Sequence, residues 1–475
     1  MKNSTLPQTA ATGSTSAGSA PITASAASRR SFLKLLGTAA FAAPFIMRDL
    51  RANPPSNRVR LVAFGVGGMG GADLGTHAGV PGVEVVGLCD VDLNRAAGGR
   101  KRWPKAFFYQ DYRELLDKEA KNFDAVTVGT PDHMHAPISI SAMQLDKHVY
   151  CQKPLTHNLY ETRRMTEIAR EKKLVTQMGI QIHGEASYRT AVKALRDGVI
   201  GKIKEVWSFD GRNWGDAGKL PERTDEVPQN LNWDAWLGVA AARPFIGNGY
   251  YHPGNWRRRL DFGVGTLGDM ACHIFDPVFG ALDLGSPTSV ISDGPAPNSW
   301  NWATRANVTL EFNGTPFTAG DKILVHWTDG GVRPPKAVLD LTRSADGKHN
   351  VPGSGSVFIG TAGVMVLPHI AWPRIYGRDD AAELNRKLST PKLGYTVPRI
   401  NHHAQFINAV RGEGKTEVNF DYAGPLTEAV LFGSVAVRFP KTLLKWNVRD
   451  ITFDLAEANK FVRRQYRAGW EVKGA

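Results

Sequence analysis

Lys153, Asp269 and His273 are three side chains suited to proton transfer. Lys153 follows the short apolar run in "HVYCQKP" and precedes a proline, so we expect it to project from the end of a buried strand. Asp269 and His273 stand four residues apart in "GDMACHIFD", a spacing that brings two side chains to one face of a helix. A neighbouring carboxylate raises the basicity of an imidazole and fixes its tautomer. This pattern favours a histidine that removes a proton from an alcohol, with the lysine on the same oxygen.

Other interpretations of these residues stay open. Asp269 can instead cap a helix whose core includes His273, and most lysines are simply solvated. An aspartate and a histidine at this spacing also suit a metal ion, but the sequence offers no obvious third ligand. We therefore predict no metal site.

A glycine-rich stretch, "GVGGMG", follows the first apolar run. Gly65 would allow a tight turn, Gly67 the approach of a pyrophosphate, and Gly70 close packing of helix on strand. Asp90 ends the next apolar run, where an acid accepts hydrogen bonds from ribose hydroxyls. An acid there repels a 2′-phosphate and favours NAD, although the nearby Arg95 leaves NADP open. The residues expected to contact the dinucleotide are Gly65, Gly67, Gly68, Met69, Gly70 and Asp90.

A second strand end carries the stretch "TPDHMHA". Pro131 closes the apolar run before it, and open parallel sheets bind ligands outside the carboxyl ends of their strands. We expect Thr130, Pro131 and His135 at the cofactor-facing rim, together with Lys153. His133 is equally well explained as a polar residue that starts a helix in water.

Short apolar runs alternate with helical stretches between residues 58 and 180. This alternation predicts an α/β fold with a doubly wound parallel sheet covered on both faces. The later sequence has a long irregular segment at 210–265, strand-like pieces and two late helices, which predicts an α+β domain with a mainly antiparallel sheet. We therefore divide the chain into a leader at 1–55, a dinucleotide-binding Rossmann domain at 56–180 and a substrate domain at 181–475.

The segment "SRRSFLK", residues 28–34, places two arginines ahead of a weakly apolar run. That arrangement is typical of a bacterial twin-arginine signal, whose cargo is exported folded. The apolar run is too short for a stable membrane anchor, which needs about twenty apolar residues. We expect cleavage after Ala42, Ala43 or Ala52, contact with the twin-arginine translocase, and a final place in the periplasm or outside the cell. A disordered tail whose arginines pair by chance is the alternative.

Charge and cysteine content limit the partners. The formal net charge is +13, but part of it lies in the leader and the rest shows no clustered basic patch, which argues against nucleic-acid binding. The three cysteines are widely spaced and flanked by apolar residues. This pattern predicts buried thiols without a disulfide, as in a protein that folds in the reducing cytoplasm.

Together these motifs resemble the Gfo/Idh/MocA family, which includes glucose-fructose oxidoreductase and inositol dehydrogenase. The resemblance is strongest at 58–160 and in "YHPGNWRRRLDFGVGTLGDMACHIFD", which looks like the exported bacterial branch of the family. It implies that Lys153, Asp269 and His273 surround the nicotinamide, with the histidine as acid and base. One departure is Gln152, where the family commonly has a glutamate that could hold the lysine charged. The resemblance also implies a homo-oligomer.

The family builds its substrate pocket after the last Rossmann strand. Gln181 and His183 in "GIQIHGE" occupy that place, and Tyr251 and His252 lie in the long loop before Asp269. Tryptophans of the loop can stack on a sugar or simply fill the domain. We therefore expect these four residues to bind a small carbohydrate.

Three functions agree with these features. The leading hypothesis is an exported NAD(P)-dependent oxidoreductase that transfers hydride between a tightly bound nicotinamide cofactor and a sugar or cyclic polyol. Because little free dinucleotide exists outside the cytoplasm, such a cofactor would be loaded before folded export. An NAD-dependent glycoside hydrolase would instead oxidise a ring carbon transiently and eliminate the aglycone, with Tyr251, His183 or His273 as the extra base. A non-enzymatic NAD-binding sensor would have no use for the lysine, aspartate and histidine.

Overall fold

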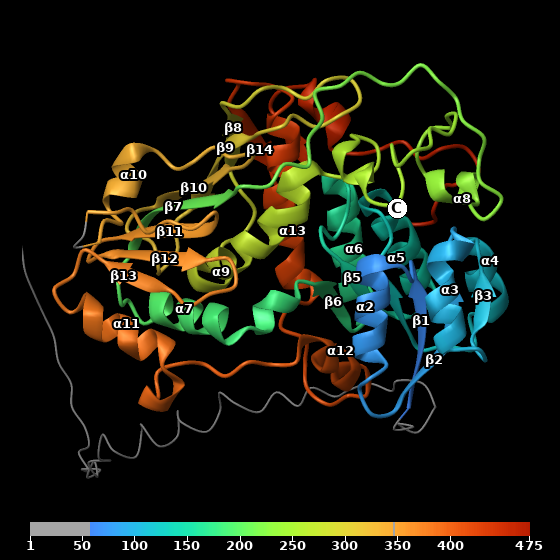
Figure 1. The fold of residues 1–475 in the computed structure, drawn as a ribbon, viewed down its shortest axis with the longest axis horizontal. Helices are drawn as coiled ribbons and strands as arrows, with labels where there is room; N and C mark the ends of the chain where they lie inside the picture. Colours follow the sequence, from blue (N-terminus) through green and yellow to red (C-terminus); the bar gives the residue numbers. More distant parts are fainter. Residues whose placement is uncertain (1–57, 345–346) are drawn as a thin grey trace, which may run out of the picture. The chain divides into compact units, whose positions relative to one another are not determined.

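A six-stranded parallel sheet forms the first part of the described chain, which comprises residues 58–344 and 347–475 of a computed structural model (Figure 1). Its strand order is β3-β2-β1-β4-β5-β6, so the chain starts in the middle and winds outward in both directions. This confirms the predicted doubly wound sheet. The strands are β1 (Val59–Phe64), β2 (Val83–Cys89), β3 (Phe107–Tyr109), β4 (Ala125–Val128), β5 (His148–Gln152) and β6 (Thr176–Gly179), and the helices are α2 (Gly68–His77), α3 (Leu93–Arg102), α4 (Tyr112–Glu119), α5 (His135–Gln144) and α6 (Leu159–Glu171).

A nine-stranded sheet follows, in the order β13-β12-β11-β7-β10-β9-β8-β14-β15. Only β7 and β10 pair in parallel among its described neighbours, so the prediction of a mainly antiparallel sheet is also confirmed. The strands are β7 (Ile203–Asp210), β8 (Ser289–Ser292), β9 (Asn307–Asn313), β10 (Lys322–Thr328), β11 (Ser354–Gly360), β12 (Val364–Pro368), β13 (Arg374–Tyr376), β14 (Leu444–Asn447) and β15 (Thr452–Phe453); the helices are α7 (Ala186–Arg196), α8 (Trp233–Leu237), α9 (Cys272–Leu282), α10 (Lys336–Asp340), α11 (Ala381–Ser389), α12 (His402–Val410) and α13 (Phe420–Ala436).

The predicted leader at 1–55, with its twin-arginine segment and cleavage positions, lies outside the described residues. Within the two described ranges, no helix combines the length and the apolar character that a membrane span needs. All three cysteines are buried and none forms a disulfide, as predicted.

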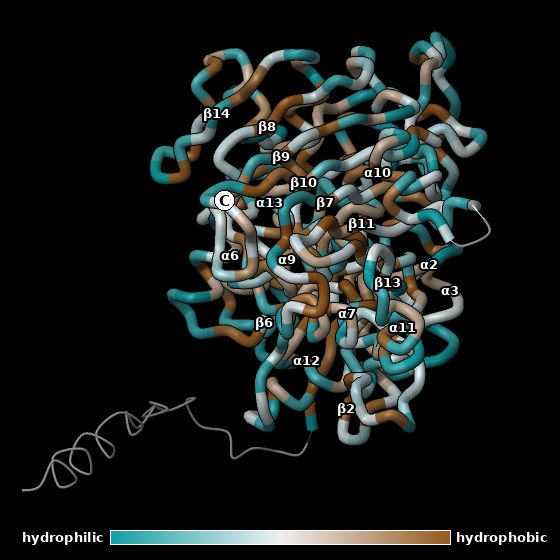
Figure 2. The backbone as a smooth tube through the Cα atoms, turned by 90° about the vertical axis from the view of Figure 1, so that its left-hand side faces the viewer, coloured by the Kyte–Doolittle hydropathy of each residue, from teal (hydrophilic) through white to brown (hydrophobic). Residues whose placement is uncertain are grey.

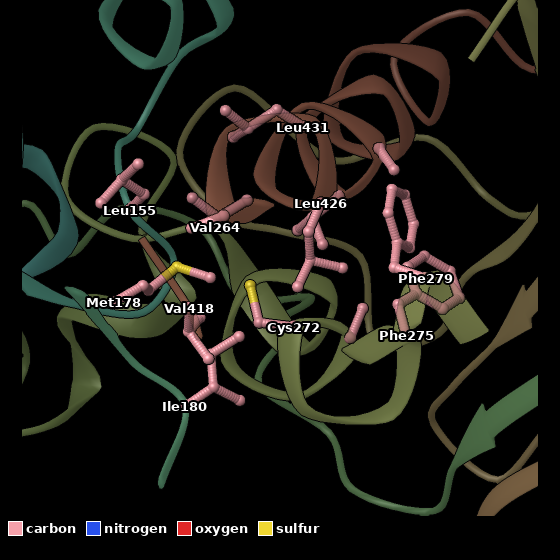
Figure 3. Packing of buried hydrophobic residues seen from close by; sticks show 14 of the residues in the cluster. Leu155, Met178, Ile180, Val264, Cys272, Phe275, Phe279, Val418, Leu426 and Leu431 are labelled. Carbon is pink, nitrogen blue, oxygen red and sulfur yellow. The ribbon is translucent and has the colours of Figure 1, made fainter. Parts of the chain in front are cut away.

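One continuous hydrophobic cluster joins both sheets. Side chains of α9 and α13, among them Phe279 and Leu426, belong to this cluster together with Met178 of β6 (Figure 3). Figure 2 shows hydrophobic stretches gathered among the strands and helices and hydrophilic stretches in many outer turns. Truncating one such buried leucine or phenylalanine to alanine costs about 2–5 kcal/mol of stability. This packing therefore ties the two sheets together.

The chain returns to the first sheet after residue 400. The Met178 amide donates to the Val418 carbonyl (2.9 Å), and the Thr416 hydroxyl donates to the Thr176 carbonyl (2.7 Å). Arg163 of α6 forms an ion pair with Glu428 of α13 at 2.7 Å. The late helices thus cover the edge of the sheet beyond β6, which the sequence pattern did not predict.

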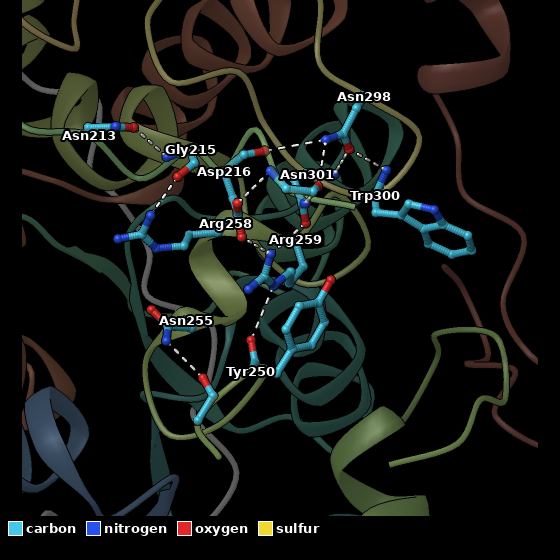
Figure 4. Close-up of polar contacts among 12 residues, drawn as sticks. Asn213, Gly215, Asp216, Tyr250, Asn255, Arg258, Arg259, Asn298, Trp300 and Asn301 are labelled. Atoms are coloured by element: carbon cyan, nitrogen blue, oxygen red, sulfur yellow. Dashed lines mark hydrogen bonds and ion pairs between the residues drawn. The ribbon is translucent and has the colours of Figure 1, made fainter. Parts of the chain in front are cut away.

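The irregular segment at 210–265 is held by the buried side chain of Arg259 (Figure 4). Its guanidinium donates to Asp216 (2.7 Å) and Asn301 (2.6 Å), and its Nε donates to the Tyr250 carbonyl (3.1 Å). Because a buried guanidinium needs partners for its donors, this network fixes the path of a segment with little regular structure. The segment can therefore carry side chains into a site.

Candidate active site

A cavity of about 430 Å³ opens at the carboxyl ends of β1, β2, β4 and β5. These strand ends supply Gly65, Asp90, Thr130 and Lys153 to its wall. The second part of the chain closes the opposite side with residues of the segment at 210–265, the turn before α9 and the end of β12. Most of the predicted dinucleotide residues and two of the four predicted substrate residues, Gln181 and His252, therefore line one space.

The glycine turn after β1 has the geometry that a phosphate-binding turn needs. Gly65 has φ +77°, and a Cβ there would lie 2.7 Å from the Gly129 carbonyl oxygen. A Cβ on Gly70 would lie 2.0 Å from the Gly65 carbonyl oxygen, so helix α2 can approach the strand only because it is glycine. Gly67, Gly68 and Met69 line the cavity where α2 begins. Backbone N–H groups at such a helix start favour an anion.

Asp90 lies beside this turn and is fixed by backbone donors. Its carboxylate accepts from the amides of Val66 (2.9 Å) and Asp92 (3.0 Å). Burial raises the pKa of Asp90, although both amides favour the charged form. The carboxylate lines the cavity at the position predicted for a ribose contact.

A strap, defined here as residues 230–257, crosses the same end of the cavity. The Leu93 amide donates to the Asn230 carbonyl, and the Asn232 amide donates to the Val91 carbonyl, both at 2.9 Å. His252 Nε2 lies 2.8 Å from Asp92 Oδ2. This predicted substrate residue therefore lies at the dinucleotide end of the cavity, where it ties the strap to the first sheet.

Unpartnered polar atoms mark the cavity as a ligand site. Thr130 Oγ1, Gln181 Oε1 and His273 Nδ1 are buried, have no hydrogen-bond partner in the described structure, and belong to residues that line the cavity. Buried polar groups are normally paired, so each needs a partner that a ligand can supply. Together with the glycine turn, they fit a bound dinucleotide and a polar substrate. No group of three potential metal-ligating side chains occurs in residues 58–344 and 347–475.

Asp269 is paired with Lys153, whose ammonium donates to its Oδ1 (2.7 Å) and to its carbonyl oxygen (2.6 Å). Arg257 Nε donates to Oδ1 (3.1 Å) and Trp214 Nε1 donates to Oδ2 (2.9 Å). Burial alone would raise the pKa of Asp269, but Lys153 and Arg257 hold it well below its usual range. Asp269 is therefore a carboxylate that orients a lysine.

His273 lines the same cavity but makes no hydrogen bond with Asp269 among the described contacts. Leu267–Ala271 is a π-helical turn, which changes the angle between residues four apart and often marks a functional site. Burial lowers the pKa of His273 well below its usual range, and Lys153 and His369 lower it further. The predicted partnership is corrected here, because the aspartate orients the lysine and the histidine is a neutral acceptor.

The rim after β4 holds the predicted residues in different ways. Thr130, Pro131 and His135 line the cavity. The His135 ring nitrogens face the carbonyl oxygens of Pro154 (2.7 Å) and Thr130 (2.8 Å). Burial lowers the pKa of His135 to about 4, so the neutral ring has one N–H and donates it to one of these two carbonyls. His133 is fully buried, which contradicts the alternative of a solvated helix start.

Gln152, the residue that departs from the family pattern, turns away from the lysine. Its Nε2 donates to Asp73 Oδ2 (2.7 Å), and His403 Nε2 lies 2.9 Å from Asp73 Oδ1. A glutamate at position 152 would set two buried carboxylates side by side, which is unfavourable. Asp269, and not residue 152, forms the ion pair with Lys153.

Two predicted substrate residues lie outside the cavity. His183 has its ring between Asp276 Oδ1 (2.8 Å) and Glu417 Oε2 (3.2 Å), a pairing that no local pattern indicates. Burial would lower its pKa, but the two carboxylates raise it to about 9. Tyr251 is buried in an aromatic cluster with Trp233 and its neighbours. Both residues therefore stabilise the fold around the site.

The cavity wall holds charged or titratable residues that were not predicted, among them Asp132, Arg257, Arg212 and His369. Asp132 is buried and accepts from the Val264 amide (3.1 Å); burial raises its pKa to about 7. Arg257 lies in "NWRRRLDFG" and Asp132 lies in "TPDHMHA", two stretches singled out from the sequence alone, so both residues could have been proposed as site residues. The others, Arg212 and His369, come from strand ends of the second sheet without a local motif.

Two family models match the chain. A Gfo/Idh/MocA model, described as oxidoreductase family, NAD-binding Rossmann fold, matches residues 59–180, and a second, described as its C-terminal alpha/beta domain, matches 189–317. Together these ranges cover more than half of the chain. The chain belongs to the Gfo/Idh/MocA oxidoreductase family.

Individual relatives within the Gfo/Idh/MocA family are distant. Inositol 2-dehydrogenase of Rubrobacter xylanophilus is 31% identical over 149 residues, which are 31% of this chain and 42% of the relative. Levoglucosan dehydrogenase of Pseudarthrobacter phenanthrenivorans is 26% identical over 189 residues, 40% of each chain. The chain thus spans less than half the length of these curated relatives.

Solved structures of the Gfo/Idh/MocA type share the fold over most of the chain. WlbA dehydrogenase from Chromobacterium violaceum, in complex with NADH and UDP-GlcNAcA, is 16% identical with a TM-score of 0.59, covering 84% of this chain and 99% of the other. Levoglucosan dehydrogenase in complex with NADH is 17% identical with a TM-score of 0.55, covering 82% and 99%. At these identities the comparison establishes the fold.

Proposed function

We propose that this protein is an exported oxidoreductase that transfers hydride between a tightly bound NAD and a sugar or cyclic polyol. The observation that carries the proposal is the cavity in which the glycine turn and Asp90 meet Lys153, Asp269 and His273. NAD, when bound, supplies the acceptor for a hydride from the carbinol carbon. The names of the relatives, inositol and levoglucosan dehydrogenases, support a polyol or sugar as substrate.

The chain's own residues divide the proton chemistry. His273 is neutral and lines the cavity, so its ring can accept the hydroxyl proton. Lys153 donates to the same oxygen and stabilises the negative charge that develops there. Asp269 is a positioning residue, because its contacts hold the lysine toward the cavity.

Tight cofactor binding is supported by the strap over the dinucleotide end. The strap is held to the first sheet by its two backbone hydrogen bonds and the His252–Asp92 contact. A cofactor that stays bound suits export through the twin-arginine translocase to the periplasm or cell exterior, the route proposed from "SRRSFLK". Asp90 favours NAD over NADP for the reason given above.

A glycoside hydrolase that uses NAD transiently is a second candidate. His369 places a second imidazole in the cavity, with its ring centre 5.9 Å from that of His273. Elimination and rehydration use more than one proton-transfer group, and a second imidazole favours that route. Tyr251 and His183 lie outside the cavity, so His273 and His369 are the candidates for that work.

The test starts from protein expressed with its own leader and purified without added cofactor. We expect denaturation to release about one dinucleotide per chain, and free sugars to reduce the bound nicotinamide. Lys153→Met should abolish reduction with the dinucleotide still bound, whereas the control Lys172→Met, in an ion pair with Asp146, should behave like wild type. Release of nitrophenol from nitrophenyl glycosides without net reduction would select the hydrolase. Protein that neither carries nor binds a dinucleotide would refute both.

A further inference from the structure

The substrate end of the cavity carries Arg212, which has no carboxylate within hydrogen-bonding distance of its guanidinium among the described residues. The nearest is Asp210, with Oδ1 3.9 Å from Nε, and Nη1 contacts Met270 Sδ instead. The side chain is 52% exposed, yet its backbone is fixed, because the Arg212 amide donates to Asp210 Oδ1 (2.8 Å). This positive charge therefore faces the cavity from a rigid base.

His369 stands beside Arg212 on the cavity wall. Its Nδ1 lies 2.9 Å from the hydroxyl of the buried Tyr188, which has no other hydrogen-bond acceptor among the described residues. The hydroxyl therefore donates to Nδ1. Burial lowers the pKa of His369 to about 4, with a further effect of Arg212, so the ring is neutral and its Nε2–H remains as a donor.

The turn that carries His369 is strained. Ile370 has φ +60° at the third position of a turn closed by the Ala371 amide on the Pro368 carbonyl (3.2 Å), a position that favours glycine or asparagine. Its side chain is 51% exposed, so burial of the isoleucine does not repay this strain. A β-branched residue held in the left-handed region is uncommon and strained. The turn keeps the neighbouring imidazole in the cavity wall.

We propose, on the basis of the function proposed above, that the substrate is a sugar acid whose carboxylate binds Arg212 and the Nε2–H of His369. Both groups are donors only. A sugar hydroxyl brings a proton of its own, which neither group can accept, whereas a carboxylate brings two acceptor oxygens and a negative charge. Lys153 and Arg257 contact Asp269 at 2.7 and 3.1 Å, whereas Arg212 has only the 3.9 Å contact with Asp210, so its charge is the least neutralised of these three.

The test measures binding, independently of turnover. The intrinsic tryptophan fluorescence of the protein as purified would be titrated with glucuronate, glucose and glucose 6-phosphate. We expect glucuronate to bind at least about tenfold more tightly than glucose, as one charge-assisted hydrogen bond predicts. Arg212→Met should remove that preference and leave glucose affinity within about twofold. The control Arg333→Met should change neither, because Arg333 contacts the Val351 and Pro352 carbonyls outside the cavity.

The outcomes separate this inference from the proposed function. Nicotinamide reduction by glucose and glucuronate with equal affinity would overturn the carboxylate site and leave the oxidoreductase intact. Tighter binding of the phosphate than of the carboxylate would overturn the assignment of the anion. Preferential binding of glucuronate without nicotinamide reduction would uphold the anion site and count against the oxidoreductase. His369→Asn supplies a second variant, expected to weaken glucuronate binding more than glucose binding.

Discussion

Replacing Asp269 by asparagine tests whether the carboxylate holds the site together by its charge. The side chains of Asp269 and Lys153 are only 16% and 12% exposed. The introduced asparagine would keep one oxygen for Lys153 and Arg257, but its amide would then face the Trp214 N–H, donor against donor. Breaking a buried ion pair by removing one partner costs about 3–5 kcal/mol. We expect D269N to lose about that much stability at neutral pH.

Urea unfolding followed by tryptophan fluorescence measures this loss. With an m-value near 3 kcal/mol/M, the midpoint should fall by about 1 M or more. The pKa of Asp269 is lower in the folded protein than in the unfolded chain, so its stabilisation is complete above about pH 4 and lost only as the pH falls further. The contribution of Asp269 itself should therefore be constant from about pH 5 to 8, and any pH dependence of the difference in that range comes from Asp132, whose pKa of about 7 is raised in part by Asp269.

The control is Asp340→Asn, which removes an equally well-contacted carboxylate at the surface. Asp340 pairs with Lys336 (2.6 Å) and Arg343 (2.8 Å) but is 35% exposed, and water screens such pairs. We expect a much smaller shift than for D269N. A D269N midpoint as close to wild type as that of D340N would refute the claim that Asp269 is the anchor of Lys153, and so would a difference that shrinks between about pH 8 and 5.

Three further predictions address the turn, the fold and the strain. Gly65→Ala adds a Cβ 2.7 Å from the Gly129 carbonyl oxygen and should abolish dinucleotide retention, measured by release on denaturation. His183→Gln should destabilise the protein most at about pH 6 and least above pH 9, as measured by unfolding across pH. The pKa of His183 rises from about 6.5 in the unfolded chain to about 9 in the folded protein. The stabilisation is therefore complete below about pH 6.5 and is lost as the pH rises through about 9. Ile370→Gly should raise stability by about 0.5–1 kcal/mol, since relief of left-handed strain exceeds the entropy cost of glycine; a lower urea midpoint would contradict the strain.

Much of the fold could be predicted because its signals are local. Apolar runs of strand length, the glycine turn and the acid at the next strand end all lie within one βαβ unit, where sequence order fixes spatial order. The prediction that Lys153 and His273 line one cavity rested on the place of Lys153 at a strand end and on the family resemblance. The partner of Asp269 could not be predicted, because a π-helical turn replaces the regular spacing from which the pair was inferred.

The rest of the site depends on long-range packing. Arg212 and His369 are 157 positions apart in the sequence and reach the cavity only because β7 and β12 both flank β11. The prediction that His183 lies in the substrate pocket was wrong for the same reason. Its ring contacts Glu417, which comes from a distant segment, and lies outside the cavity. No local pattern in a single sequence indicates such long-range contacts.

The return of the chain to the first sheet has a consequence for synthesis. Thr176 is hydrogen-bonded to Thr416, which lies 240 positions later in the chain, and Arg163 forms an ion pair with Glu428, which lies 265 positions later. A nascent chain that has emerged only to residue 180 therefore exposes the apolar edge beyond β6 and lacks the helix that covers α6. We therefore expect the unit at 56–180 to need the later segment to cover its β6 edge, and to be prone to aggregation until that segment has been synthesised. Truncation near residue 400 should leave a chain that keeps its nucleotide-binding motifs and most of the second sheet but aggregates.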